Sequence, residues 1–147
     1  MYELVLDGQE GAEILNQVAE QVQGKEDVTL LATIMLTQVN SLNGAGLAAP
    51  QVGVSKRVIV VEIDGKYQVM INPVITRHTQ DTKISREGCL SFPKLGTKVP
   101  VKRFFKVTVE YFDINWKPQR YNLKGFEAYC VQHELDHLNG ITIKQGK

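Results

Sequence analysis

An Asp64-Gly65 pair between two runs rich in β-branched residues is the feature that most restricts the fold of this chain. The runs cover residues 57–63 and 67–71, and a two-residue Asp-Gly connection is a strong signal for a β-hairpin. A second pair of runs, 106–112 and 119–123, alternates with the period of a strand on either side of a turn. The two hairpins predict antiparallel sheets.

Helical spacing of apolar residues flanks this central region. It predicts an amphipathic helix within residues 10–23 that ends at Gly24, and a more deeply packed helix over 26–42. The helical period returns over 126–138 and stops at Asn139-Gly140. This order predicts an α+β fold, in which antiparallel sheets pack around a C-terminal metal-binding helix and two helices lie at the N-terminus.

Composition limits the classes of protein that this chain can belong to. With 147 residues, 43% of them hydrophobic, the chain is expected to form one domain over residues 1–147. Lys and Arg number 17 against 16 Asp and Glu, so the chain lacks the basic excess of a nucleic-acid or membrane-surface binder. Two cysteines, no signal peptide and no membrane span predict a cytoplasmic location.

The last predicted helix contains His133-Glu134-Leu135-Asp136-His137. Histidines four residues apart lie on one face of a helix, so both can bind the same metal ion. A glutamate between them can exchange a proton with water at that metal. The pattern therefore predicts a catalytic metal site, with two surface histidines and a solvated glutamate as the plain alternative.

A catalytic metal site also needs a third protein ligand and an open position. No His, Cys, Asp or Glu follows His137, so the third ligand is expected upstream. Cys89 is the preferred candidate, because it follows a glycine that permits close approach of the backbone. Cys130 fits a small buried hydrophobe better. Asp136 points in another helical direction, and His78 lies in a polar, loop-like stretch.

A glycine-rich segment, residues 43–53, directly follows the second predicted helix. It is not a phosphate-binding loop, because no Gly-Lys-Ser/Thr follows. Its small residues allow a backbone to approach a ligand closely, and Gln51 offers an amide donor. By itself the segment is only moderately informative, and a plain turn is the default interpretation.

Taken together, three segments resemble the signature motifs of the peptide deformylases. They are Gly44-Ala-Gly-Leu-Ala-Ala-Pro-Gln51, Glu87-Gly-Cys-Leu-Ser91 and Gln132-His-Glu-Leu-Asp-His137, and they occur in the family's order. The similarity covers roughly residues 43 to 140. The resemblance implies a hydrolase that removes the N-formyl group from the N-terminal formylmethionine of newly synthesised polypeptides and releases formate.

The resemblance also implies a role for individual residues. It assigns three metal ligands, which are Cys89, His133 and His137. The ion implied is a divalent metal, natively Fe2+, for which Ni2+, Co2+ or Zn2+ can substitute. Metal-bound water or hydroxide would attack the formyl carbon, with Glu134 as general base and acid. Gln51 and the backbone N–H of Leu90 would stabilise the oxyanion.

Helical spacing places further residues on the face that carries the ligands. Three of them, Phe126, Tyr129 and Cys130, are expected to wall a pocket for the methionine side chain. The family positions near the same pocket are Ala45, Glu87 and Gly88. The peptide is expected to lie extended and to pair with the backbone near Gly46. Ordinary core packing is the alternative for these side chains.

The chain also departs from the family pattern. Its first proline is Pro50, and it carries no further helix of the kind that many members have after the metal-binding one. It is therefore interpreted as a short, C-terminally truncated member, of a kind that a phage could encode. Transient ribosome association would have no C-terminal extension to support it. The expected partners are N-formylmethionyl nascent peptides, with no nucleic acid and no membrane.

Two other functions fit part of this pattern. An HExxH metallopeptidase that cleaves peptide bonds shares the helix and the glutamate, but no downstream ligand is present. A non-catalytic metal- or peptide-binding module is the alternative from another class. Such a module would not need Glu134 or Gln51, and both are present.

Overall fold

The structure is a computed structural model that describes residues 4–24, 26–91 and 98–143. In chain order, the helices and strands, with short 3-10 helices written η, are η1 (Ala12–Asn16), α1 (Thr29–Ser41), β1 (Gly46–Ala48), η2 (Ala49–Val52), β2 (Val58–Ile63), β3 (Lys66–His78), β4 (Thr82–Glu87), β5 (Val99–Phe104), β6 (Lys106–Phe112), β7 (Pro118–Lys124) and α2 (Phe126–Leu138). None of the helices in these ranges is long and apolar enough to cross a membrane.

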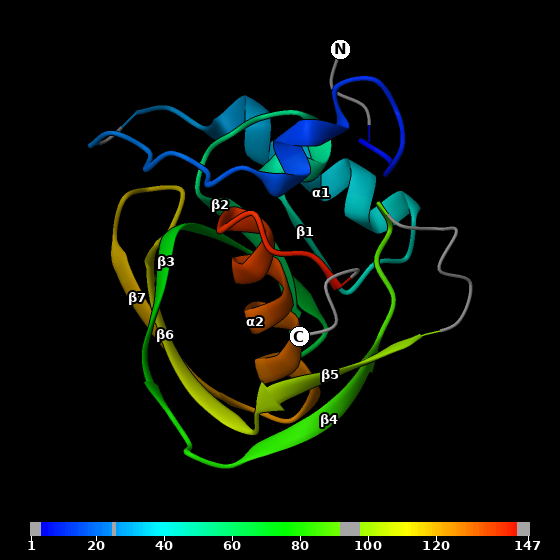
Figure 1. Ribbon diagram of the computed structural model, residues 1–147. Helices are drawn as coiled ribbons and strands as arrows, with labels where there is room; N and C mark the ends of the chain where they lie inside the picture. Colours follow the sequence, from blue (N-terminus) through cyan, green and yellow to red (C-terminus); the bar gives the residue numbers. More distant parts are fainter. Residues whose placement is uncertain (1–3, 25, 92–97, 144–147) are drawn as a thin grey trace.

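The described strands form two antiparallel sheets. One has five strands in the order β1-β2-β3-β6-β7, and the other consists of β4 and β5. The curved five-stranded sheet wraps around α2, and the β4-β5 ribbon passes below it, as Figure 1 shows. The prediction of an α+β fold with antiparallel sheets is confirmed.

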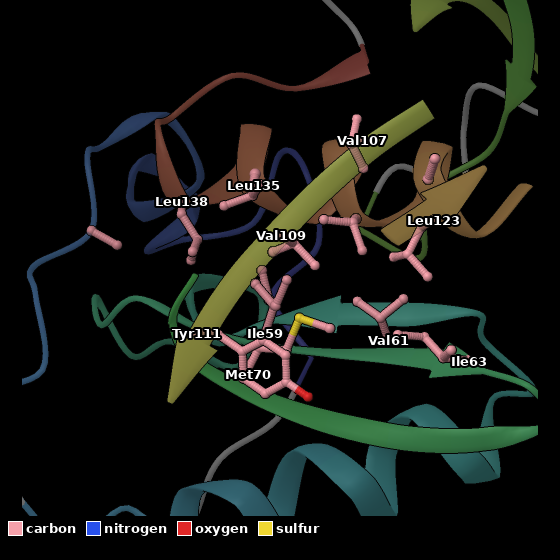
Figure 2. Close-up of a cluster of buried hydrophobic side chains, with 14 residues drawn as sticks. Ile59, Val61, Ile63, Met70, Val107, Val109, Tyr111, Leu123, Leu135 and Leu138 are labelled. Carbon is pink, nitrogen blue, oxygen red and sulfur yellow. The ribbon is translucent and has the colours of Figure 1, made fainter. Parts of the chain in front are cut away.

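Strand β2 lies at the centre of the core and is buried on both faces. Ile59 and Val61 point toward α2 and belong to the cluster of side chains drawn in Figure 2. Val58 and Val60 point the other way, into a cluster that includes residues of α1. Burial on both faces explains why this strand is a continuous apolar run, whereas β6 alternates between buried and exposed residues.

The turn between β2 and β3 has the geometry that its sequence predicts. Asp64 and Gly65 both have positive φ, 53° and 79°, as a type I′ hairpin turn requires. Strand β3 is longer than predicted and continues past Pro73 to His78. The register shifts between Ile71 and Val74, so Pro73 occupies an irregular position where no ladder hydrogen bond needs an N–H group.

The helix predicted over residues 10–23 is wrong, so the chain has one N-terminal α-helix, α1, instead of two. Only Ala12–Asn16 is helical, as a short 3-10 helix, and the chain beyond it runs alongside distant segments. Ala19 N–H donates to the Leu138 carbonyl at 2.8 Å, and Glu20 N–H donates to Ser55 at 3.0 Å. The backbone finds these partners elsewhere in the chain, which removes the need for helical hydrogen bonds.

The other two helices agree with the sequence. Helix α1 starts at Thr29, whose N–H donates to the Asp27 carboxylate at 2.9 Å. Helix α2 has the predicted bounds and ends before Gly140, which has a φ of 72°. A Cβ at Gly140 would lie 2.7 Å from the Asn16 carbonyl oxygen, so glycine also permits the close approach of the N-terminal segment.

Candidate active site

Helix α2 and the segment after β4 bring together three side chains that could hold a metal ion. The ligand atoms of Cys89, His133 and His137 all lie within 4.8 Å of one another. Cys89 Sγ is 3.2 Å from His137 Nε2. The histidines come from successive turns of α2, while Cys89 lies two residues after the end of β4. Two segments more than forty residues apart therefore form one donor set.

The other side chains considered as third ligands lie outside this cluster. Asp136 receives a hydrogen bond from Arg103 at 2.5 Å. His78 is the last residue of β3, where its ring stacks on Phe104 at 3.8 Å, so the loop-like reading of this position is wrong. Cys130 packs against the core cluster. Within the described ranges, only the Cys89 group meets the geometry of a metal site.

A network of buried charges holds His133. Its Nδ1 lies 2.9 Å from Glu87 Oε1, so Nε2 is the ring nitrogen left to bind a metal ion. Arg103, from β5, donates to both oxygens of Glu87 at 2.9 and 2.7 Å, and it also pairs with Asp136 on α2. A carboxylate behind a metal-binding histidine fixes the orientation of its ring. Arg103 thus ties the β4-β5 sheet and helix α2 to the candidate ligand His133.

The sequence did not reveal this role of Arg103. A basic residue in a strand is typical of an exposed face, yet Arg103 shares the inward face of β5 with Val101, and its side chain is only 5% exposed. Its two partners, Glu87 and Asp136, come from β4 and α2 and are visible only in the folded chain. The signal that could have found it is a strand whose inward positions include a charged residue, because such a residue needs buried partners of opposite charge.

Burial and pairing shift the pKa values of this network in opposite directions. Burial alone would raise the pKa of Glu87, but hydrogen bonds from Arg103 and His133 outweigh it and lower the pKa to about 2. Burial opposes the charged form of His133, while contacts with Cys89 and Glu87 raise its pKa to about 10. Burial and the neighbouring His133 lower the pKa of His137.

Glu134 lies between the two histidines in the sequence, and one of its carboxylate oxygens accepts no hydrogen bond from the described residues. Its Oε1 is buried and has no hydrogen-bond partner among those residues, and burial raises the pKa of its carboxyl to about 7. The other oxygen fits against β1, since a Cβ at Gly46 would lie 2.8 Å from Glu134 Oε2. Glycine is required here so that the carboxylate and the strand can approach each other.

Gln51 reaches the thiol from the short helix η2. Its Oε1 accepts a hydrogen bond from Ala48 N–H at 3.0 Å, which orients the amide. The Nε2 group then donates to Ser91 Oγ at 3.2 Å and lies 3.6 Å from Cys89 Sγ. The side chain is 2% exposed, so its donor group is held beside the metal-binding cluster.

A cavity of about 410 Å³ opens on this cluster. The residues proposed from the sequence that border it are Ala45, Gly46, Gln51, Glu87, Gly88, Cys89, Leu90, Phe126, Tyr129, Cys130, His133 and Glu134. Phe126 is 67% exposed and lies at the rim, whereas burial raises the pKa of the Cys130 thiol to about 12 and keeps it neutral. Phe92 and Pro93, which directly follow the segment Glu87–Ser91, lie outside the described residues.

The donor set fits a divalent transition metal. One thiolate and two imidazoles suit Fe2+, Zn2+, Co2+ and Ni2+, and they do not suit Mg2+ or Ca2+, which prefer oxygen. Three protein ligands also leave a position open for a reacting group, which is typical of catalytic rather than structural sites. The buried and unpartnered Glu134 oxygen beside this position fits a proton carrier.

This fold and this site together define a class, the metal-dependent hydrolases built on an HExxH helix and an upstream thiol. Comparison with known sequences makes the assignment particular. The model of the polypeptide deformylase family matches residues 1–145, and the chain belongs to that family. The chain is accordingly an enzyme, and deformylation is its activity. The metallopeptidase alternative is not favoured.

Relatives and solved structures agree with the family assignment. A peptide deformylase of Gloeobacter violaceus is 42% identical over 137 residues, which are 89% of this chain and 72% of the relative. The structure of a deformylase from a Vibrio parahaemolyticus bacteriophage, in complex with actinonin, is 43% identical with a TM-score of 0.88, covering 96% and 99% of the chains. A deformylase of Acinetobacter baumannii bound to Met-Ala-Ser is 33% identical with a TM-score of 0.88, covering 99% and 98%.

Proposed function

We propose that this chain removes the formyl group from the N-terminal formylmethionine of newly synthesised polypeptides and releases formate. The observation that carries the proposal is the cavity in which a Cys-His-His donor set adjoins a buried carboxylate with an unbonded oxygen. A water molecule adds to the formyl carbon, and the bond from that carbon to the methionine nitrogen breaks. The products are formate and a peptide with a free amine.

Cys89, His133 and His137 hold the metal in this proposal. Fe2+ is the ion that the resemblance to the family implies, and Ni2+, Co2+ or Zn2+ match the same donors. When bound, the cation supplies Lewis acidity that polarises the formyl oxygen and makes water more acidic. Glu87 keeps His133 in the tautomer that presents Nε2, because it accepts the proton on Nδ1 at 2.9 Å.

Glu134 carries the proton. It takes a proton from the attacking water and returns it to the departing amine, so one carboxyl acts first as base and then as acid. Its unbonded, buried Oε1 supports this role, because no described group competes for the proton. Gly46 keeps the carboxylate close to β1, along which the substrate is expected to lie.

Gln51 and Leu90 stabilise the oxyanion that forms during the attack. The Gln51 amide is oriented in advance by Ala48 N–H, so little reorganisation is needed when negative charge develops. The backbone N–H of Leu90 follows the ligand Cys89 directly and borders the same cavity. Removing one such donor typically costs about 10²- to 10³-fold in kcat.

The substrate's methionine side chain occupies the cavity beside α2. Phe126, Tyr129 and Cys130 form its wall on one face of the helix, and the neutral Cys130 thiol presents an apolar surface. The remaining proposed contacts come from Ala45, Gly46, Glu87 and Gly88. The carboxylate of Glu87 is hydrogen-bonded to Arg103 and His133. Glu87 therefore shapes the wall of the cavity and orients His133.

The peptide backbone pairs with strand β1. This strand lies at the end of the five-stranded sheet, and among the described residues it pairs with β2 alone, which leaves its other edge for an extended peptide. Addition of a strand provides backbone hydrogen bonds that do not depend on the peptide sequence. An enzyme that must accept many different new polypeptides benefits from this kind of recognition, and we infer that it works in the bacterial or infected-host cytoplasm where they are made.

Formate release tests the proposal. The apoprotein is loaded anaerobically with Fe2+ or with Ni2+ and mixed with formyl-Met-Ala-Ser, and formate is measured by a coupled dehydrogenase assay. Acetyl-Met-Ala-Ser and an unformylated peptide with internal bonds serve as controls. We expect formate from the formyl peptide alone. Cleavage of internal bonds without formate would contradict the proposed reaction.

Two sets of variants test the residue roles. Glu134→Gln is expected to bind one metal ion and to lose about 10²- to 10⁴-fold in kcat, because the proton carrier is gone. Cys89→Ala is expected to bind less metal, while Cys130→Ala, the matched control, binds the same amount. Metal loss from Cys130→Ala alone, measured by elemental analysis after gel filtration, would show that the ligand assignment is incorrect.

A further inference from the structure

The hydroxyl of Tyr67 donates a hydrogen bond to the carbonyl oxygen of Gly44 at 2.7 Å. Tyr67 is the second residue of β3, and Gly44 lies two residues before β1, in a segment that borders the active-site cavity. We propose that this bond makes Tyr67 a positioning residue for the substrate, because it holds residues 43–46 where they pair with the peptide backbone. Residues 43–46 are called the rim segment below. This inference rests on the proposed function.

Hydrogen bonds to three different elements hold the rim segment. The Gly44 N–H donates to the Val39 carbonyl near the end of α1 at 2.9 Å, and the Ala45 carbonyl accepts from Glu62 N–H on β2 at 2.9 Å. The paired register of β1 and β2 begins at the next residue of the chain. The phenol of Tyr67 therefore continues the row of bonds on the side where this ladder ends.

A glycine makes the rim segment dependent on these bonds. Gly44 has no side chain that could anchor it in the core, and the space beside it is already filled. A Cβ at this position would lie 3.1 Å from Leu90 Cδ1 and 3.1 Å from Val39 Cγ2. Glycine also loses more conformational freedom on ordering than any other residue. Fixing this backbone consequently needs a partner from outside the segment.

The surroundings of Tyr67 suit it to be that partner. In the hairpin register it pairs directly with Glu62, the residue whose N–H bonds to the rim segment. Its ring packs against the buried cluster that contains Leu47 of β1 and Val39 of α1. Partial burial and the Glu62 carboxylate raise the pKa of the phenol, so the hydroxyl keeps its proton and remains a donor.

The position of Tyr67 separates it from the reaction chemistry. It is not among the described residues that line the cavity, so it acts on the substrate through the Gly44 carbonyl. The candidate metal ligands come from α2 and from the segment after β4. Loss of the bond is therefore expected to weaken the binding of the peptide backbone and to leave metal binding and the chemical step unchanged.

Substrates of increasing length test the proposal. The Ni2+-loaded parent and Tyr67→Phe are compared on formyl-Met amide, formyl-Met-Ala amide and formyl-Met-Ala-Ser amide, with kcat and KM taken from formate release. In the parent, kcat/KM is expected to rise with length, because added residues form backbone bonds with the strand edge. For the longest substrate, Tyr67→Phe is expected to raise KM about 2- to 10-fold, as the loss of one hydrogen bond implies, with kcat within twofold. Formyl-Met amide is expected to be unaffected.

Tyr121→Phe is the matched control for this variant. It removes a phenol hydroxyl from β7, a strand that contributes no described residue to the cavity lining. Its ring stacks on that of Tyr111, with the centroids 6.3 Å apart, and the phenylalanine ring can keep this contact. The control is expected to match the parent on all three substrates. Circular dichroism checks that both variants are folded.

Amide hydrogen exchange provides a readout that does not depend on catalysis. The N–H groups of Gly44 and Glu62 both form hydrogen bonds that hold the rim segment, so their exchange rates report on it directly. In Ni2+-loaded Tyr67→Phe these two amides are expected to exchange about 2- to 10-fold faster than in the parent. The amides of α2 are expected to keep the protection that they have in the parent.

The possible results distinguish this inference from the proposed function. A parent that releases no formate from any of the three substrates contradicts the proposed function, and the inference about Tyr67 fails with it. A parent that releases formate, together with a Tyr67→Phe variant that behaves like Tyr121→Phe, contradicts the inference alone. Equal losses by Tyr67→Phe on all three substrates also contradict it, because they would show that the bond supports the fold and not the binding of the peptide.

Discussion

The two histidines of α2 are one helical turn apart and both buried, yet their surroundings differ. The ring of His133 is bonded to Glu87, which is held by Arg103, which in turn reaches back to Asp136 on the same helix. The ring of His137 is 1% exposed, and its Nδ1 has no partner in the described part of the chain. The rings are 5.0 Å apart and nearly perpendicular.

The comparison shows two ways to hold a metal ligand. A polar network sets the orientation of one ring through charged hydrogen bonds, which carry energy even when the metal is absent. Close packing on a buried helix holds the other. Burying these charges also costs desolvation energy. Removing one charged partner is therefore expected to destabilise the fold more than replacing all of them with apolar residues.

The largest effect is expected from removing the centre of the network. Arg103→Met leaves the buried Glu87 carboxylate without its main partner, so the free energy of unfolding is expected to fall by about 3–5 kcal/mol in urea denaturation. Arg120→Met, at an exposed position on β7, is the control and is expected to change stability by less than about 0.5 kcal/mol.

Arg103→Met/Glu87→Met sharpens this test, because it removes both charges. It is expected to regain most of the stability, since no stranded charge remains. Equal losses in the single and double variants would show that Arg103 acts through packing alone.

The next effect concerns the ligand itself. Glu87→Gln keeps the shape of the side chain but weakens its hold on His133 Nδ1, so metal affinity is expected to fall about 10- to 100-fold. Competition with a chromophoric chelator measures the change, and circular dichroism of the apoprotein confirms that the fold is intact. Glu110→Gln, on the exposed face of β6, is the control. An unchanged metal affinity would show that the Glu87-Arg103 network supports the fold and does not control metal binding.

The glutamate between the histidines is positioned by space rather than by a network. In Gly46→Ala the new Cβ would lie 2.8 Å from Glu134 Oε2 and 3.0 Å from the Val60 carbonyl oxygen. Formate release is expected to fall about tenfold, as an overpacking cost of 1–3 kcal/mol implies, with metal affinity unchanged. In Gly44→Ala the contacts are side-chain atoms at 3.1 Å, which can move, so this control should lose less activity.

The smallest effect is expected at the outer end of the network. Asp136 is 27% exposed, and water can replace much of its interaction with Arg103. Asp136→Asn is therefore expected to cost about 0.5–1 kcal/mol of stability and to leave metal affinity within twofold. A metal-affinity loss as large as that of Glu87→Gln would mean that Asp136, and not Glu87, controls the ring.

Sequence patterns predicted the turns and helices that depend only on residues close together in the chain. The Asp64-Gly65 turn needs only two residues that tolerate positive φ, and α2 needs only its apolar spacing and a terminating Gly140. The stretch over 10–23 has similar spacing but does not form an α-helix, because its backbone bonds to Leu138 and Ser55. Apolar residues at helical spacing therefore occur both in an α-helix, α2, and in a largely extended segment, residues 17–23.

Paired strands without a strong period were harder to predict. Strand β1 has three residues and resembles a turn, although it borders the active-site cavity. The β4-β5 ribbon carries charged side chains at several positions, and its pairing places Arg103 next to the helix. Predicting these strands requires knowing which strands pair with each other in the folded chain.

By itself the sequence determined that His133, Glu134 and His137 share one helical face, because 3.6 residues make a turn in any helix. It also determined the total charge. Only the tertiary structure decided that Arg103 stands behind His133 and that Lys106 faces Lys124, because strand register brings together residues that are distant in the chain. Spacing along one element is a local property, whereas contact between elements is decided by the packing of the whole core.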